Sequence, residues 1–241
     1  MKSTRLPSKP AFKPTVNRLV GALPQLSQSR LLASCESVEL PYATVLGSES
    51  EPMQSVYFPI DSVISLVATL ADGARLEVGI IGNEGMLGTS IVLGVDVSPQ
   101  HAVVQGGGSA LRMSAAVFRR RCKQDINLRE LMNRYVHVLM EQLAQTAACT
   151  RYHRVECRLA RELLMTRQRV CNDRFHLTHE FLAHMLGVRR AGVTHAARAL
   201  HARGLIDYRR GAIKVLDPAG LKKVSCACYV RGNEIYERTL G

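Results

Sequence analysis

The sequence lacks the patterns that mark membrane proteins and several large classes of enzyme. Although 46% of its 241 residues are hydrophobic, no apolar run is long enough to cross a bilayer, and the beginning shows no secretory signal peptide. The motifs GxSxG, HExxH and GxxxxGK[ST] are also missing, which argues against a serine hydrolase, a zinc peptidase and a nucleoside triphosphatase. We therefore expect a cytoplasmic, globular protein that is not an enzyme and does not bind membranes.

The seven cysteines do not suggest a disulfide framework, because their number is odd and they are scattered among apolar residues. Cys226 and Cys228 form a CAC pair without the usual spacing of metal ligands, and no third and fourth ligand stand beside it, so a structural or redox role is favoured over zinc. A second group of potential ligands comprises Cys171, His176, His179 and His184. His179 and His184 would lie on different faces of a helix, which does not suit a shared metal. We expect no metal and no cofactor.

Basic residues are concentrated in the C-terminal part of the chain. The formal net charge is +12 and the isoelectric point is about 9.7. Residues 1–150 carry 14 basic and 12 acidic side chains, whereas residues 151–241 carry 18 and 8. This uneven distribution favours an anionic partner for the C-terminal part.

The stretch from Leu177 to Asp217 has the pattern of two short helices followed by a hairpin. Thr178 can cap a first helix that ends at Gly187, where a left-handed backbone is accessible. A second helix is predicted over 190–203 and two strands over 205–208 and 212–216, with Arg210 and Gly211 at the tip between the strands. This order of elements is that of a winged helix-turn-helix.

Such a layout suits double-stranded DNA, because a helix fits the major groove while nearby arginines and helix N-termini grip the phosphates. The residues predicted to contact DNA are Thr178, Arg189, Arg190, Ala191, Thr194, His195, Arg198, Arg209 and Arg210. Short helix pairs with a basic face also occur in ordinary domains. We favour DNA binding because the helices, the glycine turn and the basic hairpin occur here in one run.

Several residues of this stretch follow the pattern of a known family. They are the threonine that opens the first helix, the Leu-Gly-Val turn, Arg190, Val193 and the Gly-Leu-Ile exit at 204–206. The stretch therefore resembles the DNA-binding domain of the Crp/Fnr family of bacterial transcription regulators. Ala191 and His195 depart from the family pattern, which has a glutamate and a second arginine at these positions in the members with the best known operators. The resemblance implies a DNA-binding regulator but does not identify its operator.

Short segments of alternating hydrophobicity dominate the first half of the chain and predict strands. These segments are 38–46, 56–59, 63–70, 75–81, 102–105 and 110–113, with short helices predicted over 17–23, 28–35 and 114–123. The strands are rich in β-branched residues and are separated by Gly, Asp, Asn, Ser and Pro, which indicates an antiparallel roll or barrel. Ala71, Asp72 and Gly73 predict a hairpin turn in which Gly73 has a positive φ.

Three motifs in these strands extend the resemblance to nearly the whole chain: VYFP at 56–59, Val-x-Ser-Leu-Val at 63–67 and EVGxxGxEGMxG at 77–88. They resemble the cyclic-nucleotide-binding β-roll of the same family. Nucleotide-binding members present a glutamate to the ribose and an arginine to the cyclic phosphate, whereas the matching positions here hold Leu87 or its neighbour and Gln100. Without the arginine a buried phosphate loses its bidentate partner.

The resemblance thus implies an altered effector pocket. Its predicted residues are Glu84, Gly85, Met86, Leu87, Gln100 and His101. The effector is unknown, and we do not expect it to be cyclic AMP. Glu84 and Gly85 also suit a purely structural turn.

A long helix predicted over 128–150 carries its apolar residues in two stripes. One stripe contains Leu128, Leu131, Tyr135 and Val138, and the other contains Met132, Val136, Leu139 and Leu143. One core face needs only one stripe, so the second is predicted to pack on a twin helix; alternatively, both stripes face a single intramolecular core. A homodimer would place two recognition helices about 34 Å apart in successive major grooves.

Together these patterns predict an α+β protein with an N-terminal antiparallel, jelly-roll-like β-roll, a long dimerisation helix and a C-terminal winged helix-turn-helix. The predicted division is a flexible tail over 1–14, a sensor domain over 15–125, the dimerisation helix over 126–150 and the DNA-binding domain over 151–241. The predicted function is sequence-specific transcription regulation by a homodimer, with DNA as partner and RNA polymerase as a further one. The alternative is a regulatory ligand-binding module that acts through protein contacts.

Overall fold

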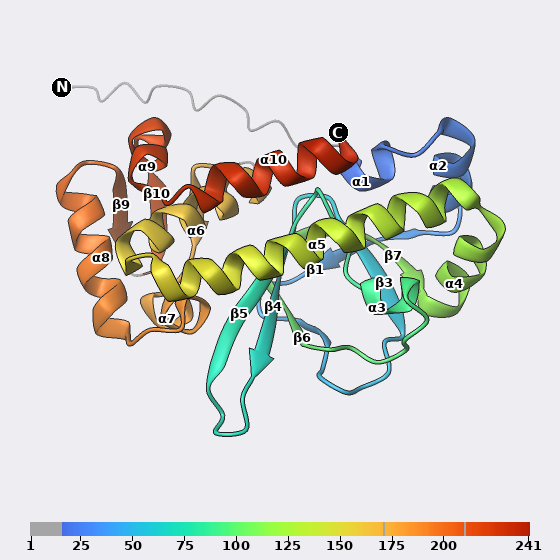
Figure 1. Ribbon diagram of the computed structural model, residues 1–241, viewed down its shortest axis with the longest axis horizontal. Coiled ribbons are helices and arrows are strands. Elements are labelled where there is room, and N and C mark those ends of the chain that lie inside the picture. Colours follow the sequence, from blue (N-terminus) through green and yellow to red (C-terminus); the bar gives the residue numbers. More distant parts are fainter. Residues whose placement is uncertain (1–15, 171, 210) are drawn as a thin grey trace, which may run out of the picture.

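The computed structural model describes residues 16–170, 172–209 and 211–241, and it shows an N-terminal β-domain and a C-terminal helical domain (Figure 1). The strands of the β-domain are β1 (Glu36–Leu40), β2 (Val45–Gly47), β3 (Ser55–Pro59), β4 (Val63–Thr69), β5 (Arg75–Ile81), β6 (His101–Gly106) and β7 (Gly108–Ser114). They form two antiparallel sheets with the strand orders β1-β7-β3 and β2-β6-β4-β5. The predicted α+β fold is confirmed, whereas the predicted tail lies outside the described residues.

The hairpin between β4 and β5 forms as predicted. Gly73 has a φ of +82°, and the backbone amide of Ala74 donates a hydrogen bond of 3.0 Å to the carboxylate of Asp72. The strand predicted over 38–46 is instead divided into β1 and β2, which belong to different sheets. Ala43 lies between them with a φ of +65°, so the chain turns there instead of continuing as one strand.

Short helices complete the β-domain. They are α1 (Arg18–Gly21), α2 (Gln25–Leu32), α3 (Thr89–Val92) and α4 (Ala115–Gln124). The predicted second helix begins three residues earlier than expected, directly after Pro24, a residue whose fixed φ suits the start of a helix. Helix α3 had not been predicted.

Helix α5 (Ile126–Tyr152) is the longest described element and runs along the β-domain to the C-terminal domain (Figure 1). Asp125 caps it by accepting hydrogen bonds from the backbone amides of Asn127 and Leu128. Both predicted apolar stripes are covered within one chain: Val138 is fully buried, and Met132 and Leu139 of the second stripe are 0% and 8% exposed. The alternative, a single intramolecular core, accounts for the burial of most of the second stripe, while Leu143 is half-buried.

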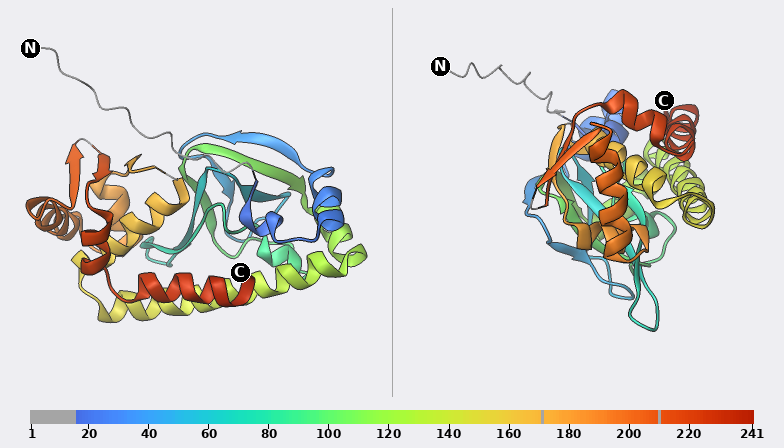
Figure 2. Two further views of the ribbon diagram at one scale, coloured as in Figure 1. Left: turned by 90° about the horizontal axis from the view of Figure 1, so that it is seen from above. Right: turned by 90° about the vertical axis from the view of Figure 1, so that its left-hand side faces the viewer.

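Helix α10 (Cys228–Leu240) covers part of α5 and packs antiparallel along it (Figure 2). The sequence had suggested that this segment belongs to the DNA-binding domain. In the structure its far end joins the β-domain, where Ile235, Tyr236 and Leu240 are buried in the same core as the strands. Two exposed ion pairs lie along it, Arg18–Glu237 at 3.0 Å and Arg238–Glu141 at 3.3 Å.

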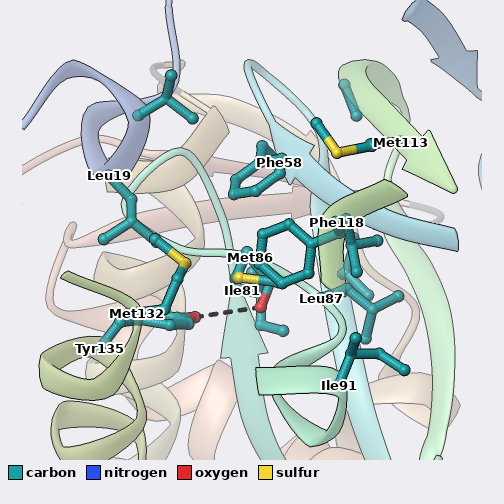
Figure 3. Packing of buried hydrophobic residues seen from close by; sticks show 14 of the residues in the cluster. Leu19, Phe58, Ile81, Met86, Leu87, Ile91, Met113, Phe118, Met132 and Tyr135 are labelled. Atoms are coloured by element: carbon teal, nitrogen blue, oxygen red, sulfur yellow. Dashed lines mark hydrogen bonds between the residues drawn. The ribbon is translucent and has the colours of Figure 1, made fainter. Parts of the chain in front are cut away.

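Aromatic and sulfur-containing side chains pack together in the core of the β-domain (Figure 3). The rings of Phe58 and Phe118 meet edge to face at 6.1 Å, and Met86 lies in the same cluster without exposure. The hydroxyl of Tyr135 on α5 donates a hydrogen bond of 3.4 Å to the carbonyl of Met86. Because burying each such large side chain contributes about 1.5–3 kcal/mol, this core holds the start of α5 firmly against the roll.

The C-terminal domain follows α5 directly. Its elements are α6 (Val155–Val170), β8 (Arg174–His176), α7 (His179–Leu186), α8 (Arg190–Ala202), β9 (Ile206–Arg209), β10 (Ala212–Val215) and α9 (Pro218–Val224). The three strands form a small antiparallel sheet in the order β8-β10-β9. Among the described residues, no helix is both long and apolar enough to span a membrane.

Candidate nucleic-acid interface and ligand sites

Helix α7 has the start and the end that the sequence predicted. The hydroxyl of Thr178 accepts a hydrogen bond of 3.1 Å from the backbone amide of Phe181, so this residue caps the helix. Gly187 ends the helix with a φ of +59°, a conformation that side chains disfavour. The turn is tight, since α8 begins only three residues later, at Arg190.

Helix α8 buries one face and exposes the other. Val193, Ala196, Ala197 and Leu200 are at most 3% exposed and pack into the domain core. The outward face carries exposed Arg190, Ala191, His195 and Arg198, preceded by exposed Arg189. The geometry thus presents these five predicted residues together on one surface, with the N-terminus of the helix at one end.

Two other predicted contact residues already have partners inside the domain. The hydroxyl of Thr194 donates a hydrogen bond of 3.0 Å to the carbonyl of Arg190 and lies 3.1 Å from Nδ1 of His179. Thr178 is occupied as the helix cap. These residues shape the surface of α8 through internal contacts.

The surface around α8 is electropositive. His179 packs against Tyr208 with ring centroids 5.0 Å apart, and its pKa lies below the ordinary value, first because of partial burial and then because of the charges of Arg190 and Arg198. Repulsion from these two arginines reflects the positive charge that gathers beside His179. The positive electrostatic potential at this surface favours the binding of a polyanion.

The hairpin of β9 and β10 flanks this helix as a wing. Gly211 has a φ of +85°, and a side chain there would collide with the ring of His176 on β8. Arg209, the last residue of β9, is exposed, while Arg210 lies outside the described residues. Strand β8 had not been predicted; it completes the sheet by pairing Phe175 with Ile213.

The comparisons with known proteins agree with this geometry. Residues 157–224 match the model of the Crp-like helix-turn-helix domain. This part of the chain is similar to the Crp-like helix-turn-helix domain.

Several solved structures are similar to most of the chain. FixK2 from Bradyrhizobium japonicum has a TM-score of 0.67 at 14% identity, covering 80% of this chain and 98% of FixK2. The c-di-GMP-responsive global regulator CLP from Xanthomonas campestris has a TM-score of 0.64 at 16% identity, with 80% and 99% covered. A transcriptional regulator of the CRP family from Thermus thermophilus has a TM-score of 0.65 at 15% identity, with 78% and 96% covered. No curated protein sequence matches the chain. The chain thus shares its overall fold, a β-domain followed by a helix-turn-helix domain, with these proteins.

The six residues predicted to form an effector pocket do not surround one cavity. Met86 and Leu87 are buried in the β-domain core, at 0% and 3% exposure. Gly85 is pressed against the ring of Tyr135, where a side chain would collide with the hydroxyl oxygen. These three positions are therefore structural.

The remaining three residues of the predicted pocket, Glu84, Gln100 and His101, do not line the same cavity. Glu84 lines a cavity of about 290 Å³ between β5, α5, α6 and α10, where its carboxylate pairs with Arg169 at 2.7 Å. Gln100 lines a separate hollow of about 420 Å³ beside α5. His101 is half-buried at the start of β6 and lines neither. The sequence motif identified the loop but did not predict the directions in which its side chains point.

The structure also corrects the expectation for Cys226 and Cys228. Cys149 and His153, from the end of α5, supply the third and fourth potential ligands that the local sequence lacks. The Cys149 and Cys226 sulfurs are 3.5 Å apart, and the pKa of Cys149 lies well below its ordinary value, chiefly because of the hydrogen bond with Cys226 and then through His153 and Arg161. The four residues form a Cys₃His donor set that could bind a metal.

Proposed function

We propose that this protein is a sequence-specific, DNA-binding transcription regulator that acts in the cytoplasm as a homodimer. The observation that carries the proposal is the outward face of α8, where Arg190, His195 and Arg198 stand exposed on a Crp-like helix-turn-helix domain. A helix in this position can enter the major groove and reach base edges, while the wing contacts phosphates. Contact with RNA polymerase remains a prediction.

Replacing Arg190 by alanine should weaken binding to the specific site by about 1–3 kcal/mol, because an arginine at the start of the recognition helix can contact base edges with two hydrogen bonds. Replacing Arg209 on the wing should weaken binding to all DNA sequences about equally, because phosphate contacts carry no sequence information. Gel shifts with the selected site and with random DNA separate the two effects. Unchanged specific binding by Arg190→Ala would show that another face of α8 meets the DNA.

The same gel shifts distinguish DNA binding from the alternative, a module that acts through protein contacts. A protein that neutralises phosphates releases counterions, so its affinity must fall linearly on a plot of log affinity against log salt. A protein that shows no DNA binding at low salt would favour the alternative. The sites themselves can be found by genomic footprinting.

A dimer requires a surface that the single chain leaves uncovered. The exposed side of α5 offers Ile126 and Met140, at 50% and 63% exposure, together with exposed Ala147. These residues recur at multiples of the heptad spacing, which is the pattern by which two helices pack. We therefore place the proposed dimer contact on this side of α5, and no longer on the buried second stripe.

The effector of the β-domain is proposed to be something other than a cyclic nucleotide. Met86 and Leu87 fill the core instead of facing a ligand, and Gln100 carries no charge for a cyclic phosphate. Loss of a buried charged hydrogen bond costs about 2–5 kcal/mol, which turns micromolar affinity into roughly millimolar affinity. Calorimetry should therefore detect no micromolar binding of cyclic AMP or cyclic GMP; a micromolar dissociation constant for either would refute this part of the proposal.

A further inference from the structure

Four potential metal ligands converge where the end of α5 meets the start of α10. Cys149 lies in the last turn of α5, and His153 caps this helix. Cys226 precedes α10, and Cys228 is its first residue. The ligand atoms of all four lie within 4.8 Å of one another. We propose that these four residues bind one zinc ion, and that this ion clamps both ends of the DNA-binding domain.

The distances fit a single tetrahedral ion. Zinc lies about 2.3 Å from a thiolate sulfur and about 2.0–2.1 Å from an imidazole nitrogen, so the edges of the tetrahedron measure about 3.8 Å between sulfurs and about 3.6 Å between sulfur and nitrogen. Here the Cys149 and Cys226 sulfurs are 3.5 Å apart, and the Cys228 sulfur lies 3.6 Å from Nδ1 of His153. Small movements of side chains would complete the geometry.

Other chemistry fits the four residues less well. In a [4Fe–4S] cluster each thiolate binds a different iron, so the thiolates stand further apart than these sulfurs do. A [2Fe–2S] cluster needs its ligands in two pairs on two irons, whereas the ligand atoms here all lie within 4.8 Å of one another. A disulfide between Cys149 and Cys226 would leave Cys228 and His153 unused. One imidazole and three thiolates, in a tetrahedral arrangement, form a known type of structural zinc site.

The side chains around the four potential ligands favour cysteines in the thiolate form. The side-chain amide of Gln145 donates a hydrogen bond of 2.9 Å to the Cys228 sulfur. Zinc with three thiolates carries a net charge of about −1. Two arginines of α6 reach the last turns of α5 beside the site, where Arg158 lies 3.4 Å from the hydroxyl of Thr150 and Arg161 lies 3.1 Å from that of Thr146. Hydrogen bonds and charges in the surroundings of a metal tune its ligands in this way.

The position of the site gives it a mechanical role. The chain leaves α5 at His153, builds the whole helix-turn-helix domain and returns at Cys226. The ligands that meet at the metal are thus 75 and 77 residues apart in the sequence. A metal at this junction would hold α6 and α10 to the end of α5, and so fix the domain that carries α8.

The first test is the metal content of the full-length protein purified under reducing conditions. Mass spectrometry of the elements should find about one zinc per chain, and Cys226→Ser and Cys228→Ser should lose it. Cys122→Ser is the matched control, because Cys122 is half-buried on α4 and takes no part in the site, and it should keep its zinc. Iron with inorganic sulfide, or a Cys149–Cys226 disulfide in the purified protein, would overturn the assignment.

A second measurement does not depend on the folding of cysteine variants. Competition with a chromophoric chelator should show that the wild-type protein binds zinc more tightly than micromolar, and His153→Ala, a change at an exposed residue, should weaken zinc binding at least tenfold. Cobalt(II) in place of zinc should give the visible bands of a tetrahedral site and a thiolate charge-transfer band. Affinity weaker than micromolar, or cobalt spectra without thiolate bands, would refute the site.

The clamping role rests on the proposed function and has its own readout. Removal of zinc should lower the affinity for the specific DNA site at least tenfold and lower the melting temperature by about 5–10 °C. Zinc-loaded and zinc-free protein with equal DNA affinity would refute the clamp while leaving the metal site intact. If the loaded protein binds no DNA at all, the proposed function fails and the metal content still decides the site.

Discussion

Val138→Asp should unfold the protein instead of separating a dimer. Val138 is fully buried on α5, within the core that joins this helix to the β-domain. The change removes about 1.5–3 kcal/mol of apolar burial and places a carboxyl group where it has no partner, for a total of more than about 4 kcal/mol. Small proteins are stable by only about 5–15 kcal/mol, so the change removes a large share of the free energy of unfolding. Urea unfolding followed by circular dichroism measures the effect.

Met140→Asp is the matched control, two residues further along the same helix. Met140 is 63% exposed, so the aspartate remains in water and each chain should keep its circular dichroism spectrum. If α5 pairs through its exposed side, sedimentation should show a monomer for this variant and a dimer for the wild type. A wild-type urea midpoint for Val138→Asp would mean that α5 packs differently from the structure described here.

The contrast between these two residues shows what periodicity can and cannot predict. The spacing of apolar residues correctly marked Leu128, Leu131, Met132 and Val138 as buried positions of a long helix. It could not name the partner of each stripe, because a second stripe is equally suited to a twin helix or to another helix of the same chain. The partner is α10, which lies about 90 residues further along the chain and had not been predicted at all.

Sequence signals for helix ends and turns gave reliable predictions of structure. Thr178, Gly187 and Gly73 act through hydrogen bonds and backbone angles within a few residues, and the structure confirms all three. Ligands and pockets depend on contacts between distant segments. The spacing of Cys226 and Cys228 gave no metal signal because the remaining ligands, Cys149 and His153, come from another helix.

The effector motif left the orientation of its residues undetermined for a related reason. It placed Met86 and Leu87 in the correct loop, but a motif does not tell which way a side chain points. In this chain Gly85 lets the loop approach Tyr135 so closely that its apolar residues enter the core. The nearby charged residue, Glu84, turns instead toward α6.

That turn creates a buried ion pair between the two domains, and Arg169→Met should break it at a large cost. Arg169 on α6 and Glu84 in the β-domain are 2.7 Å apart, with side chains only 8% and 17% exposed. Methionine keeps most of the apolar length but leaves Glu84 without its cation. Removing one partner of a buried pair typically costs about 3–5 kcal/mol, because the other charge stays buried without compensation.

Arg167→Met on the same helix is the control. Arg167 pairs with Asp173 at 2.6 Å, but both side chains are more than a third exposed. A pair of this kind contributes less than about 1 kcal/mol. Equal losses in the two variants would show that the Arg169 pair is solvated and does not join the domains strongly.

The loss at Arg169 should also depend on pH, since two more buried carboxyls lie near it. Burial raises the pKa of Glu77 and of Glu162, and the charge of Arg169 opposes the rise at both. A carboxyl whose native pKa is raised binds protons more tightly when folded, so the free energy of unfolding falls as pH rises above the unfolded value of about 4.3. Without Arg169 the native pKa of both carboxyls rises further, so this fall extends to higher pH. Urea unfolding should therefore show a larger difference between Arg169→Met and wild type at pH 7.5 than at pH 5, and a difference that does not grow with pH would contradict the placement of Arg169 beside these acids.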